Sequence, residues 1–302
     1  MSGKANSYKS IIYALSANFA IAVAKLIAAV ITNSGSMLAE GIHSLADCGN
    51  QGLLLLGMKR ARRKPDDQHP LGYGKTVYFW SFIVAIMLFS MGGLFSVYEG
   101  LHKLHDTEQM RSPWIAIGVL VFAIIAEALS MAGCVREVNK VRHGRSFYQW
   151  FRETRQSELM VIFGEDLAAL LGLVFALAAV SLAMITGNPV YDAAGSIGIG
   201  VLLLVIAALV GREVKALLIG QGVEPIEKAR MLEYLEKTPE IEHVFNLLTL
   251  QLGDDVMVAI KAQFRPQSSD IALIDAINRA EAGFKKRFPN VVWCFCEPDY
   301  HD

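Results

Sequence analysis

The chain has 302 residues, of which 53% are hydrophobic and 19% charged, and its mean hydropathy is +0.38. These values exceed what the core of a soluble domain requires, so the composition indicates a membrane protein. With 28 basic and 29 acidic residues the net charge is −1, which gives no indication of a nucleic acid or of a strongly acidic partner.

Six apolar runs are long enough for a helix to cross about 30 Å of hydrocarbon. They are residues 10–32, 36–58, 77–101, 113–135, 159–185 and 190–217. The first run is too long for the apolar core of a signal peptide, so we expect it to stay in the protein. Lysine and arginine gather in the second and fourth loops, residues 59–75 and 136–155. The positive-inside rule therefore predicts both loops and both termini in the cytoplasm, and we expect a multi-pass protein of a bacterial inner membrane.

From about Val223 the pattern changes to that of a water-soluble module. The spacing predicts helices over 225–237 and 271–288, and strands over 244–252, 256–264 and 291–295. The order αββαβ is typical of a small α+β domain, and we expect a ferredoxin-like fold. The sequence thus predicts a six-helix transmembrane domain, residues 1–217, followed by a cytoplasmic α+β domain, residues 218–302.

The second apolar run contains the polar stretch EGIHSLAD, residues 40–47. Glu40, His43, Asp47 and Asn50 follow one another in steps of three and four, so a helix would place them on one face. A charged side chain at the bilayer centre costs at least about 2.5 to 3.5 kcal/mol, so this face requires a partner, water or a ligand. A simpler alternative is that His43 and Asp47 only join helices by hydrogen bonds.

The fifth apolar run has its own carboxylates, Glu165 and Asp166, with no basic residue near them in the span. Bringing these groups close to Asp47 is tolerable only if protons or a cation lie between them. An imidazole together with carboxylate oxygens suits a divalent ion of the first transition row. We therefore favour a metal site over hydrogen-bonded helix contacts.

Two motifs carry a family resemblance: HSLAD at residues 43–47 and HPLGYGK at residues 69–75. Together with the six apolar runs and the C-terminal module, they resemble the cation diffusion facilitator family of divalent-metal transporters, and within it the branch around zinc transporter nine. The resemblance implies a homodimer that exports Zn²⁺ or a similar ion from the cytoplasm by alternating access, in exchange for protons. It implies no enzymatic activity and no cofactor besides the transported metal ion.

In this family the transport site is formed by two ligands on the second helix and two on the fifth. His43, Asp47 and Asp166 match three of these positions, whereas the fourth is Ile162, which cannot bind a metal. Either Glu165 supplies the fourth ligand, which we favour, or the site keeps three protein ligands and a water. The loss of one imidazole reduces the preference for Zn²⁺ over Mn²⁺, Fe²⁺ or Co²⁺.

Two further metal sites of the family are incomplete in this chain. In the loop after the second run, Asp66 and His69 match, but Tyr73 stands where a second histidine would be, so we interpret the loop as structural. In the C-terminal module the corresponding positions have no complete set of ligands: Phe245, Lys261, Phe295 and Glu297. We expect this module to support dimerisation by packing.

Several alternatives stay open at this stage. A thiolate site could combine Cys294 and Cys296 with His243 or His301, although buried thiols at a strand end are the simpler interpretation. Glu99 and Glu127 could belong to an exit path or proton relay, whereas we expect Lys25 to snorkel or to join helices. Two rival functions are a regulatory membrane scaffold without transport and an intramembrane metal-dependent hydrolase, although no HExxH motif is present.

Overall fold

The structure is a computed structural model that describes residues 4–105 and 112–301, with side chains from residue 18 onward. The chain forms two compact units. The first unit runs to Gly57 and continues with Trp80–Ser146 and Ser157–Val214; the second comprises Met58–Phe79, Phe147–Gln156 and the chain from Lys215 onward.

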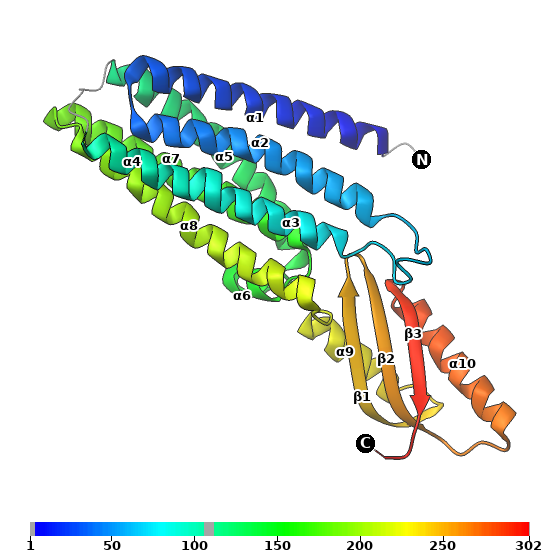
Figure 1. Ribbon diagram of the computed structural model, residues 1–302. Helices are drawn as coiled ribbons and strands as arrows, with labels where there is room; N and C mark the ends of the chain where they lie inside the picture. The colour runs from blue at the N-terminus through cyan, green and yellow to red at the C-terminus, as the bar shows by residue number, and fades with distance from the viewer. Residues whose placement is uncertain (1–3, 106–111, 302) are drawn as a thin grey trace. The chain divides into compact units, whose positions relative to one another are not determined.

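Long helices contain all six predicted apolar runs (Figure 1). They are α1 (Lys4–Thr32), α2 (Gly35–Ala61), the continuous segment Thr76–Leu104, α5 (Pro113–Val141), α7 (Ser157–Thr186) and α8 (Val190–Ile219). Four of them are long and apolar enough to cross a membrane: Thr76–Leu104, α5, α7 and α8. The described apolar part of α1, Asn18–Thr32, is shorter, and α2 contains Glu40, Asp47, Lys59 and Arg60. Six spans therefore stay a prediction.

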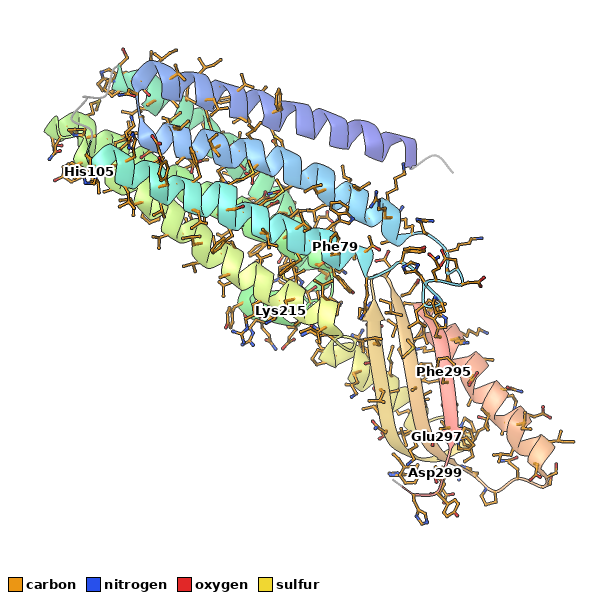
Figure 2. The ribbon with its side chains drawn as sticks, in the orientation of Figure 1. Phe79, His105, Lys215, Phe295, Glu297 and Asp299 are labelled. Carbon is orange, nitrogen blue, oxygen red and sulfur yellow. The ribbon has the colours of Figure 1, made fainter. Side chains whose placement is uncertain are left out.

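The segment Thr76–Leu104 is not a uniform α-helix. It consists of α3 (Thr76–Met87), the π-helical turn η1 (Leu88–Leu94) and α4 (Phe95–Leu104). Figure 2 labels Phe79, in the first turn of α3, and His105, which directly follows α4. Wide π-helical turns inside helices occur often at functional sites. Here η1 contains Gly92, where an added β-carbon would lie 3.6 Å from Nδ1 of His43.

Glycines let this segment approach α8 closely. A β-carbon on Gly100 would lie only 2.8 Å from the carbonyl oxygen of Ala193, and one on Gly200 only 2.7 Å from the backbone nitrogen of Val97. Such contacts leave no room for a side chain. Small residues at helix contacts are typical of membrane proteins, where close backbone packing drives association.

The start of α2 is held by a carboxylate from α8. Asp192 accepts hydrogen bonds from the Ser34 hydroxyl at 2.7 Å and from the Gly35 backbone N–H at 2.6 Å. The first N–H groups of a helix have no partner within the helix and favour a negative charge. Asp192 therefore fixes α2, which supplies His43 and Asp47 of the predicted site, against α8.

The second unit contains a three-stranded sheet in the order β1-β2-β3 (Figure 1). Its elements are α9 (Pro225–Glu236), β1 (Ile241–Leu252), β2 (Asp255–Phe264), α10 (Asp270–Arg287) and β3 (Val291–Pro298), which confirms the predicted order αββαβ. β2 pairs antiparallel with β1 and parallel with β3. The ferredoxin-like assignment stays a prediction. The short helix α6 (Phe147–Glu153), between α5 and α7, also belongs to this unit.

Alternation along β2 creates two different faces of the sheet. Val256, Val258 and Ile260 are buried and contribute to a core with α9 and α10, whereas the residues between them are only partly buried. This is the period of two expected for a strand with one covered face. The other face carries Leu248 and Phe295, which are 62% and 57% exposed.

The loop after α2 packs against the turn between β1 and β2. A β-carbon on Gly74 would overlap the carbonyl oxygen of Leu252, and Gly253, with φ of +71°, donates its N–H to the Tyr78 hydroxyl at 3.1 Å. These contacts explain why residues 58–79 belong to the same compact unit as the sheet. The predicted division at residue 217 instead counted this loop with the transmembrane helices.

Candidate functional site

Polar side chains follow one face of α2, as their spacing predicts. His43 is fully buried, and its Nε2 lies 3.5 Å from Oδ2 of Asp47, one turn further along. Neither ring nitrogen of His43 has a hydrogen-bond partner among the described residues, and the same holds for Oδ1 of Asp47 and Oδ1 of Asn50. Buried polar atoms without partners are costly, so this face of α2 has free capacity to bind a ligand.

The two neighbouring carboxylates of α7 face different helices. Glu165 accepts a 2.6 Å hydrogen bond from the side-chain amide of Asn50 on α2. Asp166 accepts one of 3.3 Å from the Ser130 hydroxyl on α5. Consecutive residues on a helix point about 100° apart, which lets one dipeptide contact two neighbouring helices. α7 therefore brings acidic groups to the junction of α2 and α5.

A cavity of about 20 Å³ lies at this junction. Its lining comes from α1, α2, α5 and α7 and comprises Asn18, Ile21, Ser44, Asp47, Gln51, Glu127, Ile162, Glu165, Asp166 and Ala169. Four of these side chains are carboxylates, three carry an amide or a hydroxyl group, and none is basic. A cavity with this lining inside an apolar helix bundle is suited to a small cation or to protons.

The cavity contains three of the four predicted ligands: Asp47, Glu165 and Asp166. His43 contacts Asp47 but is not part of the lining. Across residues 18–105 and 112–301, no three His, Cys, Asp or Glu side chains lie close enough together to hold a metal ion. The complete coordination set of His43, Asp47, Asp166 and Glu165 therefore stays a prediction. Ile162 lines the cavity as an apolar wall, at the position where the family resemblance expects a ligand.

Two polar residues have roles that sequence reasoning did not assign. Glu127 on α5 lines the cavity, and the signal for it was a single carboxylate within a very apolar run. Lys25 was expected to snorkel toward a helix end or to join helices, and the first of these is wrong. Its side chain is fully buried, lies 3.3 Å from Oε2 of Glu40 and donates a 2.7 Å hydrogen bond to Ser44. The ion pair with Glu40 on α2 keeps the Lys25 ammonium inside the helix bundle.

In the loop after α2, hydrogen bonds join the residues that match the family's second metal site. The Tyr73 hydroxyl donates to Oδ2 of Asp66 at 2.6 Å, and Nδ1 of His69 lies 3.4 Å from Oδ1 of the same carboxylate. The bond from Tyr73 holds the pKa of Asp66 below its ordinary value and raises the pKa of Tyr73 itself. The guanidinium of Arg63 lies 4.6 Å from the centre of the Tyr73 ring. Tyr73 thus forms a hydrogen bond within the loop at the position where the family resemblance expects a metal ligand.

The thiols of the C-terminal module lie on the covered side of the sheet. Cys294 pairs with Val258 and Cys296 with Ile260, and both cysteines pack in or against the core. Burial raises the pKa of Cys294 to about 11 and that of Cys296 to about 12. The two thiols therefore belong to the buried side of the strand, which agrees with the simpler interpretation from the sequence.

On the opposite face of the sheet lie residues at the former metal positions. Figure 2 shows Phe295, Glu297 and Asp299 following one another along β3 and just beyond it. Lys261 pairs with Glu297 across the strands and forms a 3.2 Å ion pair with Asp299. An ammonium at the centre of this group would repel a divalent ion.

The apolar helices and the acidic cavity between them define an integral membrane protein with a negatively charged site inside its helix bundle. Residues 11–219 match the cation efflux transmembrane domain, so the chain belongs to the cation efflux family, whose members are transporters and not enzymes.

Similar proteins support the same family membership. The chain is 37% identical over 232 residues to the mitochondrial proton-coupled zinc antiporter SLC30A9 of Homo sapiens, and 36% identical over 231 residues to that of Xenopus laevis. Both matches cover 76% of this chain and 41% of the relative. Metal tolerance protein C4 of Arabidopsis thaliana is 28% identical over 250 residues, which is 82% of this chain and 55% of that protein. The chain thus spans about half or less of the length of these relatives.

Proposed function

We propose that the chain transports a divalent transition-metal cation across a membrane, with Zn²⁺ as the favoured substrate and Mn²⁺, Fe²⁺ and Co²⁺ as alternatives. The observation that carries this proposal is the cavity in which Asp47, Glu127, Glu165 and Asp166 meet without a basic residue in the lining. Carboxylates crowded inside an apolar bundle attract a cation strongly. Membership of the cation efflux family and the zinc antiporters among the relatives support the same substrate class.

The transported ion would bind between α2 and α7. His43, Asp47 and Asp166 would be its ligands, with Glu165 as the fourth, and His43 is the one of these that does not line the cavity. Its ring nitrogens have no hydrogen-bond partner among the described residues, and Asp47 already lies 3.5 Å away. A rotation of the imidazole toward the cavity would add the nitrogen ligand that zinc prefers to a set of oxygens.

Exchange with protons follows from the charges in the cavity. Four carboxylates around one small buried cavity cannot all remain ionised without compensation, so protons would occupy the site when no metal does. Binding of a divalent ion would release these protons, and their return would release the ion. The protein would therefore work as an antiporter that exposes its cavity alternately to the two sides of the membrane.

We further infer a homodimer that forms through the uncovered face of the sheet. Leu248 pairs with Ala259, and Ala259 pairs with Phe295, so the three side chains form an apolar row across all three strands. Leu248 and Phe295 are more than half exposed in the single chain. An exposed apolar row of this kind favours contact with a second copy.

The orientation proposed for this transporter places both termini and the basic loops on the cytoplasmic side of a bacterial inner membrane. Those loops are residues 59–75 and 136–155, which hold most of the lysine and arginine between the helices. With this orientation the direction of transport would be export from the cytoplasm.

The test is a flux measurement on the full chain in sealed vesicles with an imposed pH gradient, repeated for Zn²⁺, Mn²⁺, Fe²⁺ and Co²⁺. Metal entry that depends on the gradient supports the proposal. One observation favours a second candidate, a membrane scaffold without transport: Ile162 fills the wall of the cavity where the family resemblance expects a ligand. Absence of flux for all four ions, from protein shown to be folded, would favour the scaffold.

A further inference from the structure

A buried ion pair joins α1 and α2 next to the cavity. The side chains of Lys25 and Glu40 are both 0% exposed, and Nζ lies 3.3 Å from Oε2. The same ammonium donates a 2.7 Å hydrogen bond to the hydroxyl of Ser44. The second carboxylate oxygen of Glu40 has no hydrogen-bond partner among the described residues.

This pair is separated from the cavity by a single hydroxyl group. Ser44 lines the cavity, whereas Lys25 and Glu40 do not. On α2, Ser44 lies one turn after Glu40 and about one turn before Asp47. Because the ammonium bonds to Ser44, it contacts α2 on the Asp47 side of Glu40. The positive end of the pair therefore lies nearer to the cavity than the negative end.

Stability alone does not explain such a pair. Removing two charges from water costs several kcal/mol per ion, and replacing a buried ion pair by uncharged residues of similar volume is often neutral or stabilising. The pair also leaves one oxygen of Glu40 without a hydrogen bond, which adds to its cost. A role in the electrostatics of the neighbouring cavity accounts for a charge at this position.

We propose that Lys25 is a resident cation that sets the affinity of the cavity for its metal ion. The inference rests on the proposed transport function and adds a residue that determines how tightly the ion is held. The four carboxylates of the lining would bind a divalent ion so strongly that release becomes slow. A fixed positive charge behind Ser44 weakens binding and speeds release, and Glu40 holds that charge in place.

Four variants separate this electrostatic role from a purely structural one. Lys25→Arg keeps the charge, and Glu40→Gln keeps the ammonium but removes its counter-charge. Lys25→Met removes the ammonium, and the double variant Lys25→Met with Glu40→Gln removes both charges at similar volume. Because the double variant leaves no unpaired ion in the bundle, we expect it to fold even where a single variant does not.

The experiment measures initial rates of Zn²⁺ flux against Zn²⁺ concentration in vesicles containing the full chain, with Zn²⁺ binding to the purified protein as a second readout. We expect KM and Kd to fall about tenfold in the double variant and in Lys25→Met, together with a lower maximal rate because release is slower; tenfold corresponds to about 1.4 kcal/mol. Lys25→Arg should resemble the wild type, and Glu40→Gln should raise KM.

The outcomes distinguish this inference from the function on which it rests. Wild-type protein that neither binds nor transports Zn²⁺ contradicts both. Wild-type flux with the same KM and Kd in the double variant overturns the role of Lys25 alone. Lys25→Met and Glu40→Gln should change KM in opposite directions. If they lose only maximal rate or thermal stability, the role of Lys25 is also overturned, because a purely structural ion pair gives that result.

Discussion

The side-chain amide of Asn50 donates a 2.6 Å hydrogen bond to Oε1 of Glu165, which joins α2 to α7 inside the helix bundle. Glu165 is the residue we favour as the fourth metal ligand, so the same carboxylate has both a structural partner and a proposed function.

Asn50→Ala tests this link. It leaves a buried oxygen of Glu165 without its hydrogen-bond partner, which costs about 1 to 3 kcal/mol, so we expect a lower midpoint of thermal unfolding in detergent and slower Zn²⁺ flux. Ser90→Ala is the control, because the Ser90 hydroxyl only bonds to Ile86 of its own helix. Equal midpoints for the two variants would show that the bond does not hold α2 to α7.

Close packing against α8 gives a second prediction. In Gly100→Ala the new methyl group meets Ile197 at 2.6 Å and the Ala193 carbonyl oxygen at 2.8 Å, so the helices must separate. We expect a loss of roughly 1 to 3 kcal/mol, seen as an earlier thermal transition of the purified protein. Gly118→Ala on α5 is the matched control, since nothing lies within 4 Å of its β-carbon. A transition unchanged in both variants would contradict this account of the contact.

The loop after α2 should not be required for transport. Replacing Asp66 and His69 by Ala removes side chains that are about half exposed and that only close the loop, so we expect flux largely as in the wild type. A loss as large as that of Asp47→Ala would show that the loop binds the transported ion.

Tyr73→His should add a metal site to this loop. It places a second imidazole where the Tyr73 ring now lies 4.2 Å from that of His69 and where the hydroxyl reaches Asp66. Calorimetric titration of the full chain with Zn²⁺ is expected to show one additional binding event. Titration identical to that of the wild type would indicate that the loop cannot form a three-ligand site.

Removal of the Tyr73 hydroxyl should change how the stability of the protein depends on pH. Because the pKa of Asp66 is lowered in the folded protein, its contribution to stability is present above its unfolded pKa and is lost as the pH falls through the folded value. In Tyr73→Phe the main cause of the lowered pKa is gone, so this acid-sensitive contribution should shrink. Thermal unfolding of both proteins between about pH 2 and 6, around the ordinary pKa of Asp, measures the difference. The same pH dependence in both would contradict the assignment.

Dimerisation should depend on the apolar row of the sheet and not on metal. Phe295→Glu places a charge in the row, so we expect a shift toward monomer in sedimentation of the full chain in detergent. Ile271→Glu on α10 is the control, because Ile271 is 72% exposed but lies outside the sheet. A dimer that dissociates with a chelator would instead indicate a metal site in the module.

Local sequence patterns made the architecture predictable from sequence. Apolar runs predicted the long helices, and strand-like runs over 244–252, 256–264 and 291–295 predicted the three strands, because both patterns are local. The π-helical turn Leu88–Leu94 was not predicted, since it depends on how Gly92 and Gly93 pack against other helices.

The site was only partly predictable for a similar reason. Spacing placed His43 and Asp47 on one face of a helix, but it did not show that the cavity includes Glu127 or that Lys25 pairs with Glu40. Both facts depend on the rotation of α1 and α5 about their axes. Those rotations are set by packing between distant segments, which a single sequence does not reveal.

The most direct test of the central claim records Zn²⁺ entry and proton movement in the same vesicles, for the wild type and for Asp47→Asn. Asp47 lines the cavity and contacts His43, and the amide keeps its shape while removing its charge. We predict that the wild type moves Zn²⁺ and protons in opposite directions and that both fluxes disappear together in the variant. Zn²⁺ flux that persists in Asp47→Asn, or wild-type flux without opposing proton movement, would contradict the account.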